Sequence, residues 1–177
     1  LQNAIYGESR AAMRLQQVLQ RIRHPYVTRR HTFDFPTKAH TMIGDTGLDN
    51  IRDLMTRTLN DNIPGDYIET GVWRGGATIF MRAILAAHDI KDRRVFVADT
   101  FEGLPKPNSK KDPKDKRDRL WALEELSFSR EMVEENFRKY GLLDGQVIFL
   151  KGLFSQTLPK LTTERFSLIR LDGDMYE

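Results

Sequence analysis

The most constraining feature of this chain is an alternation of four short apolar segments with helical patterns, which begins near Asp66. The apolar segments are rich in β-branched and aromatic residues, and the stretches between them place apolar residues at helical spacing. This alternation is typical of an α/β fold, because a crossover must bring the chain back before the next parallel strand begins. We therefore expect a mainly parallel sheet with strands at 67–72, 94–99, 146–151 and 166–172.

Apolar periodicity and turn residues predict the remaining elements. The expected helices span 4–23, 49–59, 77–87, 120–140 and 153–161, the last interrupted by Pro159. Segment 106–119 is rich in proline and lysine and indicates a solvated loop. The chain thus divides into an N-terminal helical arm or cover, 1–60, and a Rossmann-like domain, 61–177.

Composition excludes several classes of protein and site. The chain has no cysteine, which removes disulfides, cysteine zinc sites and thiol nucleophiles. No apolar run approaches the roughly 18 residues that a membrane span needs, and the N-terminus lacks the apolar core of a signal peptide. We expect a cytoplasmic protein with no membrane partner.

The net charge of +3 is concentrated in two basic blocks, 1–40 and 106–119. Clustered lysine and arginine would suit a nucleic acid. The lysines of the second block, however, alternate with aspartates, and no aromatic residue is interleaved for base stacking. We expect no nucleic-acid partner.

A glycine-rich turn, ETGVWRGG at 69–76, joins the first strand to the next helix. It lacks the Lys-Ser or Lys-Thr of a phosphate-binding P-loop. Trp73 stands where a dinucleotide fingerprint has its middle glycine, so a pyrophosphate would be crowded. The remaining ligand is a nucleoside without phosphates whose carboxylate the helix N-terminus receives, and S-adenosylmethionine (SAM) fits this description.

Two more acidic motifs follow strand ends. Asp99 ends the second strand, where an acid can accept hydrogen bonds from ribose hydroxyls, although it can equally cap a helix. Asp172 and Asp174 flank a glycine after the fourth strand and offer one oxygen ligand for a hard divalent ion and one free base. A metal and a base together suit O-alkylation, because a metal-bound hydroxyl loses its proton readily. The same Asp-x-Asp pattern also suits a metal-dependent nucleotide-sugar glycosyltransferase, and a non-catalytic nucleotide-binding module is a further alternative.

The strings ETGVWRGG, DTFEGLP and LDGDMYE, in this order and spacing, resemble the macrocin O-methyltransferase (TylF-like) family. The resemblance covers 41–177 and implies a Rossmann-like class I methyltransferase that uses SAM and Mg²⁺. It also implies an O-methyltransferase of antibiotic biosynthesis that acts on a sugar hydroxyl of a macrolide or aminocoumarin type of glycoside. In the family a further strand ends in an Asp-Asp pair that completes the metal site, whereas this chain stops at Glu177. We therefore expect a sheet truncated after the fourth strand and an incomplete metal site.

By motif, the resemblance assigns Asp172 as a metal ligand and Asp174 as the general base. It further implies a small-molecule glycoside acceptor and a homo-oligomer. Thr41 and Met42 would cover the cofactor, and Ser127 and Phe154 would flank its adenine. The complete set of expected cofactor-binding residues is Thr41, Met42, Glu69, Thr70, Gly71, Val72, Trp73, Asp99, Thr100, Phe101, Glu102, Gly103, Ser127 and Phe154.

Overall fold

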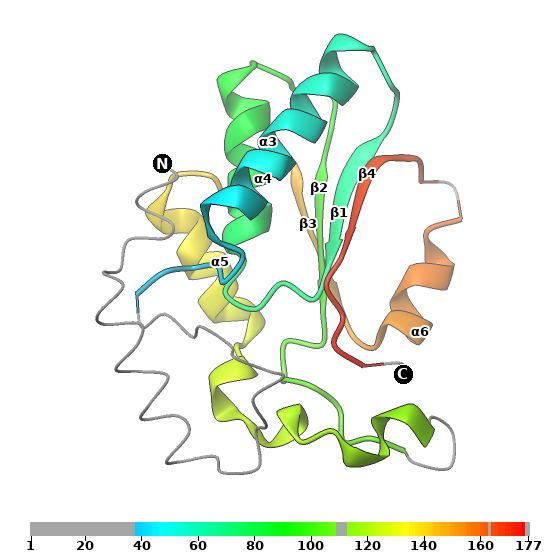
Figure 1. The fold of residues 1–177 in the computed structure, drawn as a ribbon. Coiled ribbons are helices and arrows are strands. Elements are labelled where there is room, and N and C mark those ends of the chain that lie inside the picture. The colour runs from blue at the N-terminus through cyan, green and yellow to red at the C-terminus, as the bar shows by residue number, and fades with distance from the viewer. Residues whose placement is uncertain (1–37, 109–112, 163, 176–177) are drawn as a thin grey trace.

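The computed structural model describes residues 38–108, 113–162 and 164–175 (Figure 1). The helix expected at 4–23 lies outside the described residues. The elements in chain order are α3 (Gly44–Asn60), β1 (Asp66–Thr70), α4 (Gly76–Ala87), β2 (Val95–Asp99), α5 (Arg130–Lys139), β3 (Val147–Lys151), α6 (Phe154–Thr157) and β4 (Phe166–Leu171). Four short 3-10 helices complete them: η1 (Pro113–Arg117), η2 (Leu120–Ala122), η3 (Glu124–Leu126) and η4 (Leu158–Lys160).

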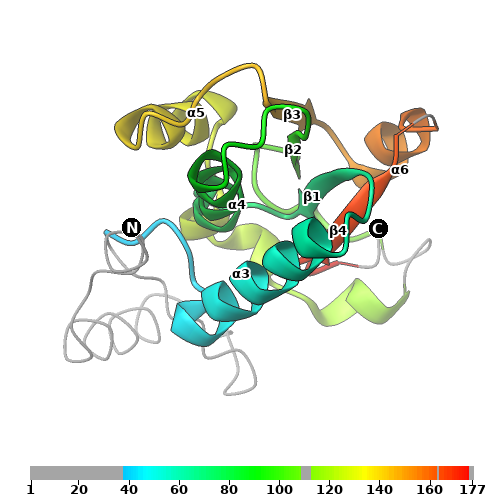
Figure 2. The ribbon, with the colours of Figure 1, turned by 90° about the horizontal axis from the view of Figure 1, so that it is seen from above.

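The four strands form one sheet in the order β3-β2-β1-β4, and all three strand pairs are parallel. The expected α/β fold with a mainly parallel sheet is therefore confirmed. Helices α3, α4 and α5 cover one face of the sheet and α6 the other (Figure 2). The carboxyl ends of the parallel strands consequently meet at one edge, where each strand continues into a loop.

The main core lies between the sheet and helices α3, α4 and α5. Every residue of β1 is buried, as expected for a central parallel strand. Helix α3 places Leu48, Ile51 and Met55 on one buried face at helical spacing, and these side chains join the same core as α4 and the strands. The predicted arm thus contributes a core helix, and the division of the chain at residue 60 stays a prediction.

The helix predicted at 120–140 is wrong over its first half. Residues 120–126 form η2 and η3, and an α-helix begins only at Arg130, after Ser129, whose hydroxyl accepts a hydrogen bond from the Met132 amide. Two tertiary interactions account for the difference. Leu120 belongs to a small hydrophobic cluster against which Met42 and Trp73 pack, and the indole of Trp73 donates to the carbonyl of Glu125 at 2.7 Å. These contacts outweigh the helical periodicity of the local sequence.

Segment 106–119 contains η1, and its described residues are mostly exposed, as expected of a solvated loop, although Asp115 is buried. Among the described residues, no helix combines the length and the apolar character that crossing a membrane requires.

Candidate functional site

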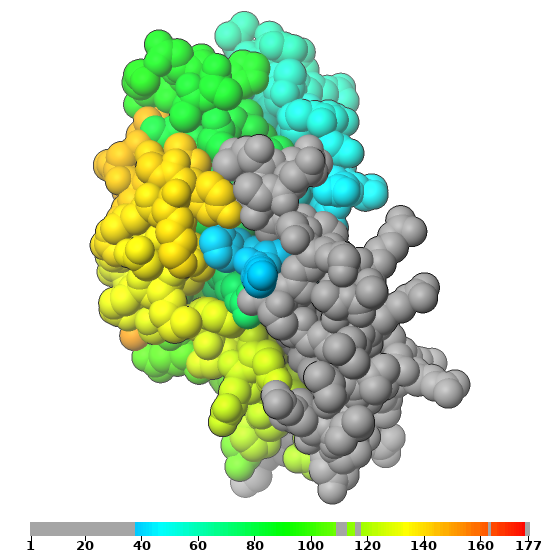
Figure 3. Space-filling view, turned by 90° about the vertical axis from the view of Figure 1, so that its left-hand side faces the viewer, coloured from blue at the N-terminus to red at the C-terminus, as the bar shows by residue number. Residues whose placement is uncertain are grey.

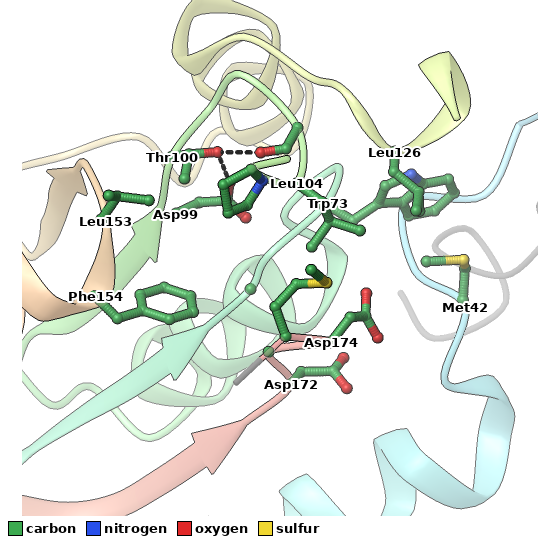
Figure 4. Close-up of a pocket in the computed structure, with 15 residues that line it drawn as sticks. Met42, Trp73, Asp99, Thr100, Leu104, Leu126, Leu153, Phe154, Asp172 and Asp174 are labelled. Carbon is green, nitrogen blue, oxygen red and sulfur yellow. Dashed lines mark hydrogen bonds between the residues drawn. The ribbon is translucent and has the colours of Figure 1, made fainter. Parts of the chain in front are cut away.

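A cavity of about 280 Å³ lies at the carboxyl ends of the strands. All three sequence motifs contribute to its wall, together with the segment before α3 and the loop that leads into α6 (Figure 4). Such a crevice is where open α/β sheets bind ligands. Its lining residues are Met42, Gly71, Trp73, Asp99, Thr100, Gly103, Leu104, Pro105, Leu126, Leu153, Phe154, Asp172, Gly173, Asp174 and Met175.

Gly71 allows the ends of β1 and β4 to approach closely. Its φ is +81°, and a Cβ atom built there would lie 2.3 Å from the carbonyl oxygen of Asp172. The amide of Asp172 donates to the Thr70 carbonyl at 2.9 Å, which holds the two chain segments side by side. The glycine turn and the Asp-x-Asp motif therefore meet because residue 71 has no side chain.

The N-terminus of α4 is capped by the chain itself. The amide of Gly76 donates to the carbonyl of His40 at 2.7 Å, and a Cβ on Gly76 would lie 2.2 Å from that oxygen. This amide therefore already has a hydrogen-bond acceptor within the protein. The sequence predicted that the helix N-terminus would bind a ligand carboxylate, but this amide is not available for it. Neither Gly75 nor Gly76 lines the cavity, whereas Met42, two residues after His40, does.

Trp73 adopts the left-handed conformation, with φ +50°, and its side chain lines the cavity. A bulky residue is strained in this region, and backbone strain of this kind clusters at functional sites. The Arg74 guanidinium lies 4.3 Å from the Trp73 ring centroid and 4.8 Å from that of Phe128, and it donates to the Ala39 carbonyl at 2.9 Å. Together with the hydrogen bond from the Trp73 indole to Glu125, these contacts join the glycine turn to the segment before α3 and to η3.

Asp99 links two turns. Its Oδ2 accepts from the Val72 amide at 2.8 Å and its Oδ1 from the Phe101 amide at 2.9 Å. The predicted ribose acid is thus already held in place by backbone donors. A carboxylate oxygen can accept more than one hydrogen bond, so the half-buried Asp99 keeps acceptor capacity for a ligand in the cavity.

Glu69 is buried behind the cavity lining. Its Oε1 accepts from Arg170 Nη1 at 2.5 Å, whereas its buried Oε2 has no hydrogen-bond partner within the described structure. Burial raises the pKa of Glu69 to about 8, and the nearby Arg170 acts in the opposite direction. An acid with one orphaned oxygen next to a cavity is a candidate partner for a cationic ligand group.

Asp172 and Asp174 both line the cavity and are exposed to it. Within the described ranges, no group of three or more His, Cys, Asp or Glu side chains is arranged to hold a metal ion. Two carboxylates nevertheless fit the needs of Mg²⁺, which takes one or two of them and fills its other positions with water or substrate oxygens.

The structure brings nine of the predicted site residues together around the cavity: Met42, Gly71, Trp73, Asp99, Thr100, Gly103, Phe154, Asp172 and Asp174. Seven predicted cofactor residues are not in the lining: Thr41, Glu69, Thr70, Val72, Phe101, Glu102 and Ser127. Most of these are buried behind it, while Glu102 points to solvent and pairs with Lys151 at 2.9 Å, and Ser127 packs beside Gly103.

Six lining residues were missed by sequence reasoning: Leu104, Pro105, Leu126, Leu153, Gly173 and Met175. Four of them belong to or directly follow a predicted motif, so a signal was present in the motif strings themselves. Leu126 was hidden by the wrong helix prediction, and Leu153 was assigned to the predicted helix 153–161, whereas α6 begins only at Phe154.

Comparisons with known proteins identify the family to which this chain is similar. The model of the family described as Macrocin-O-methyltransferase (TylF) matches residues 5–177. A relative from Streptomyces olivaceus, named 8-demethyl-8-(2,3-dimethoxy-alpha-L-rhamnosyl)-tetracenomycin-C 4'-O-methyltransferase, is 50% identical over 145 residues, which cover 81% of this chain and 56% of the relative. Mycinamicin III 3''-O-methyltransferase from Micromonospora griseorubida is 49% identical over 146 residues, with coverages of 81% and 58%. The chain thus spans a little over half the length of the curated relatives it matches.

Solved structures of methyltransferases are also similar to this chain. The O-methyltransferase NovP superposes with a TM-score of 0.71 at 46% identity, covering 80% of this chain and 59% of that one. The calicheamicin methyltransferase CalS11 has a TM-score of 0.56 at 18% identity, covering 96% and 70%, and supports the fold alone.

Proposed function

The chain belongs to the macrocin O-methyltransferase family, and on this basis we propose that it transfers the methyl group of SAM to a sugar hydroxyl of a glycosylated secondary metabolite. The observation that carries the proposal is the convergence of three motifs on one cavity. Gly71 and Trp73, Asp99, and the Asp172–Asp174 pair come from three different strand ends and line the same space. The names of the relatives, which are sugar-modifying O-methyltransferases, support the same substrate class.

The cofactor would lie across the Asp99 side of the cavity. Asp99 and Thr100 face Phe154 and Leu153 there (Figure 4), a polar and an apolar surface that suit a ribose and an adenine ring. The orphaned Oε2 of Glu69 fits the ammonium of a methionine moiety. SAM, when bound, supplies an electrophilic methyl group on a sulfonium.

The acceptor side would lie toward Met42, Trp73 and Leu126, beside the two aspartates (Figure 4). Asp172 would hold Mg²⁺, which when bound lowers the pKa of a coordinated hydroxyl. Asp174 accepts the hydroxyl proton as the new oxygen–carbon bond forms and the carbon–sulfur bond breaks. The apolar wall of Trp73 and Leu126 excludes water from this transfer.

Isothermal titration calorimetry tests the proposed function. We expect the protein to bind S-adenosylhomocysteine (SAH), the product that retains every cofactor contact except the methyl group, and not to bind UDP-glucose. Binding of UDP-glucose without SAH would support the glycosyltransferase alternative and overturn the proposal. Homo-oligomerisation stays a separate prediction, which analytical ultracentrifugation would check.

A further inference from the structure

The guanidinium of Arg170 joins two carboxylates at the ends of neighbouring strands. Its Nη1 donates to Glu69 Oε1 at 2.5 Å and to Asp172 Oδ2 at 2.7 Å. The register pairs Glu69 of β1 with Arg170 of β4, and residue 172 follows two positions later, on the same side of the extended chain. The three ionisable side chains therefore form one connected row, which we call the charged row.

The charged row leads from the interior to the cavity. The exposed fraction of the side chain is 3% for Glu69, 21% for Arg170 and 52% for Asp172. The buried end is fixed, because Glu69 lies in a fully buried strand. The exposed end is Asp172, which lines the cavity. Arg170 thus connects an immobile residue to one that a ligand can reach.

The contact also determines which part of Asp172 a ligand can use. The backbone amide of Asp172 is bound to Thr70 and its Oδ2 to Arg170, so the carboxylate is held at two points. Its Oδ1 is not used by Arg170. An exposed carboxylate without such a partner would occupy several rotamers, and binding would then have to order it.

We propose that Arg170 is a positioning residue, which holds the carboxylate of Asp172 so that Oδ1 is presented to a divalent cation. This inference rests on the proposed function, in which Asp172 is the protein ligand of Mg²⁺. Hydrogen-bond partners of metal ligands orient them, and their loss typically weakens metal affinity about 10- to 100-fold. Arg170 has this relation to Asp172 and would not itself be a ligand, because a guanidinium has no acceptor atom.

Manganese binding measured by electron paramagnetic resonance, in the presence of SAH, tests the assignment without any turnover. We expect Arg170→Gln to raise the Kd for Mn²⁺ about tenfold or more, while the affinity for adenosine, which lacks the amino-acid part assigned to Glu69, changes less than twofold in EDTA. Arg170→Lys keeps the charge but has one terminal nitrogen in place of the fork, and we expect an intermediate Kd. If Arg170→Gln does not fold, the lysine variant carries the comparison.

Arg94→Gln is the matched control. Arg94 also joins two carboxylates, Asp66 at 2.6 Å and Glu164, but it lies at the opposite ends of the strands. Arg94→Gln should reduce the stability of the protein and leave the Kd for Mn²⁺ unchanged. Equal weakening by both glutamine variants, or unchanged affinity in Arg170→Gln, would overturn the role of Arg170 and leave the proposed function standing. A parent protein that binds SAH but no Mn²⁺ would overturn this inference, because Asp172 would then hold no cation, and it would leave the proposed binding of the cofactor standing.

Discussion

Asp174 differs from Asp172 in a way that separates their expected roles. Both line the cavity, but only Asp172 is held by Arg170. If Asp174 is the general base, Asp174→Asn removes the proton acceptor and leaves the cofactor contacts in place. We expect methyl transfer from labelled SAM to a glycoside acceptor to fall about 100-fold or more, with the affinity for SAH within twofold of the parent.

The matched control for this prediction is Asp89→Asn, the same change at an exposed aspartate that pairs with Lys91. Its φ of +55° suits asparagine. It should leave transfer unchanged. Full activity in Asp174→Asn would show that another group accepts the proton.

Glu69 should make the stability of the protein depend on pH. Burial raises its folded-state pKa to about 8, above the ordinary value of 4.5. Between these values the folded state binds more protons than the unfolded state, so the contribution is fully present below pH 4.5 and is lost as the pH rises through about 8. We expect the free energy of unfolding, measured with urea from pH 5 to pH 8, to fall less steeply in Glu69→Gln than in the parent.

The control for Glu69 is Glu135→Gln on the exposed side of α5, where the partner is Arg138 at 3.3 Å. This change should leave the parent's pH dependence in place. Parallel curves for Glu69→Gln and the parent would mean that Glu69 has the same pKa in the folded and unfolded states.

The contact between Gly71 and Asp172 can be separated from the backbone conformation of glycine. Gly71→Ala introduces a Cβ 2.3 Å from the Asp172 carbonyl oxygen at a φ of +81°, whereas Gly141→Ala has a similar φ of +66° and no atom within 4 Å. The second change costs only the conformational strain, about 1–2 kcal/mol. We expect Gly71→Ala to cost clearly more in urea unfolding and also to weaken SAH binding. Equal costs would show that β1 and β4 can move apart freely at this point.

The elements differ in how well local sequence predicts them. The strands were predicted to within two residues at each end because buried parallel strands read as short apolar runs. The 120–129 segment was predicted wrongly because its conformation depends on Trp73, about fifty residues away in sequence. The cap of α4 by His40 is likewise a long-range contact that no local pattern contains. The motifs therefore predicted much of the cavity wall, but they did not predict Leu126, whose position depends on the long-range contact of Trp73.

The interaction between Trp73 and the η3 segment gives a prediction at the scale of elements. Trp73→Phe keeps an aromatic ring in the cavity wall but removes the indole donor to the Glu125 carbonyl. We expect a loss of about 1 kcal/mol in stability and faster amide exchange within 120–128. Trp121→Phe makes the same chemical change inside that segment, where the ring contacts Lys106, and should not accelerate exchange. Similar exchange in both variants would mean that Trp73 does not hold the segment.

Across the whole molecule, the cavity wall is assembled from segments that stretch from Met42 to Met175 in sequence. A ligand that fills the cavity must therefore protect distant parts of the chain together. One side carries Asp99 and Phe154, and the other carries Met42 and Trp73 (Figure 4). The segment before α3 lies against α5 at the surface (Figure 3), where His40 contacts Tyr140 at the end of that helix.

Hydrogen exchange with two ligands of different length tests this arrangement. Adenosine should protect the turns at Asp99 and Phe154, whereas SAH should also protect the end of β1 and the Asp172 segment beside it, because the proposed function places its amino-acid part at Glu69. At 100 times its Kd, SAH should stabilise the protein by about 2.7 kcal/mol. If SAH protects no more of the chain than adenosine does, the aspartate pair does not share one site with the cofactor. The methyl acceptor would then have to be sought outside this cavity.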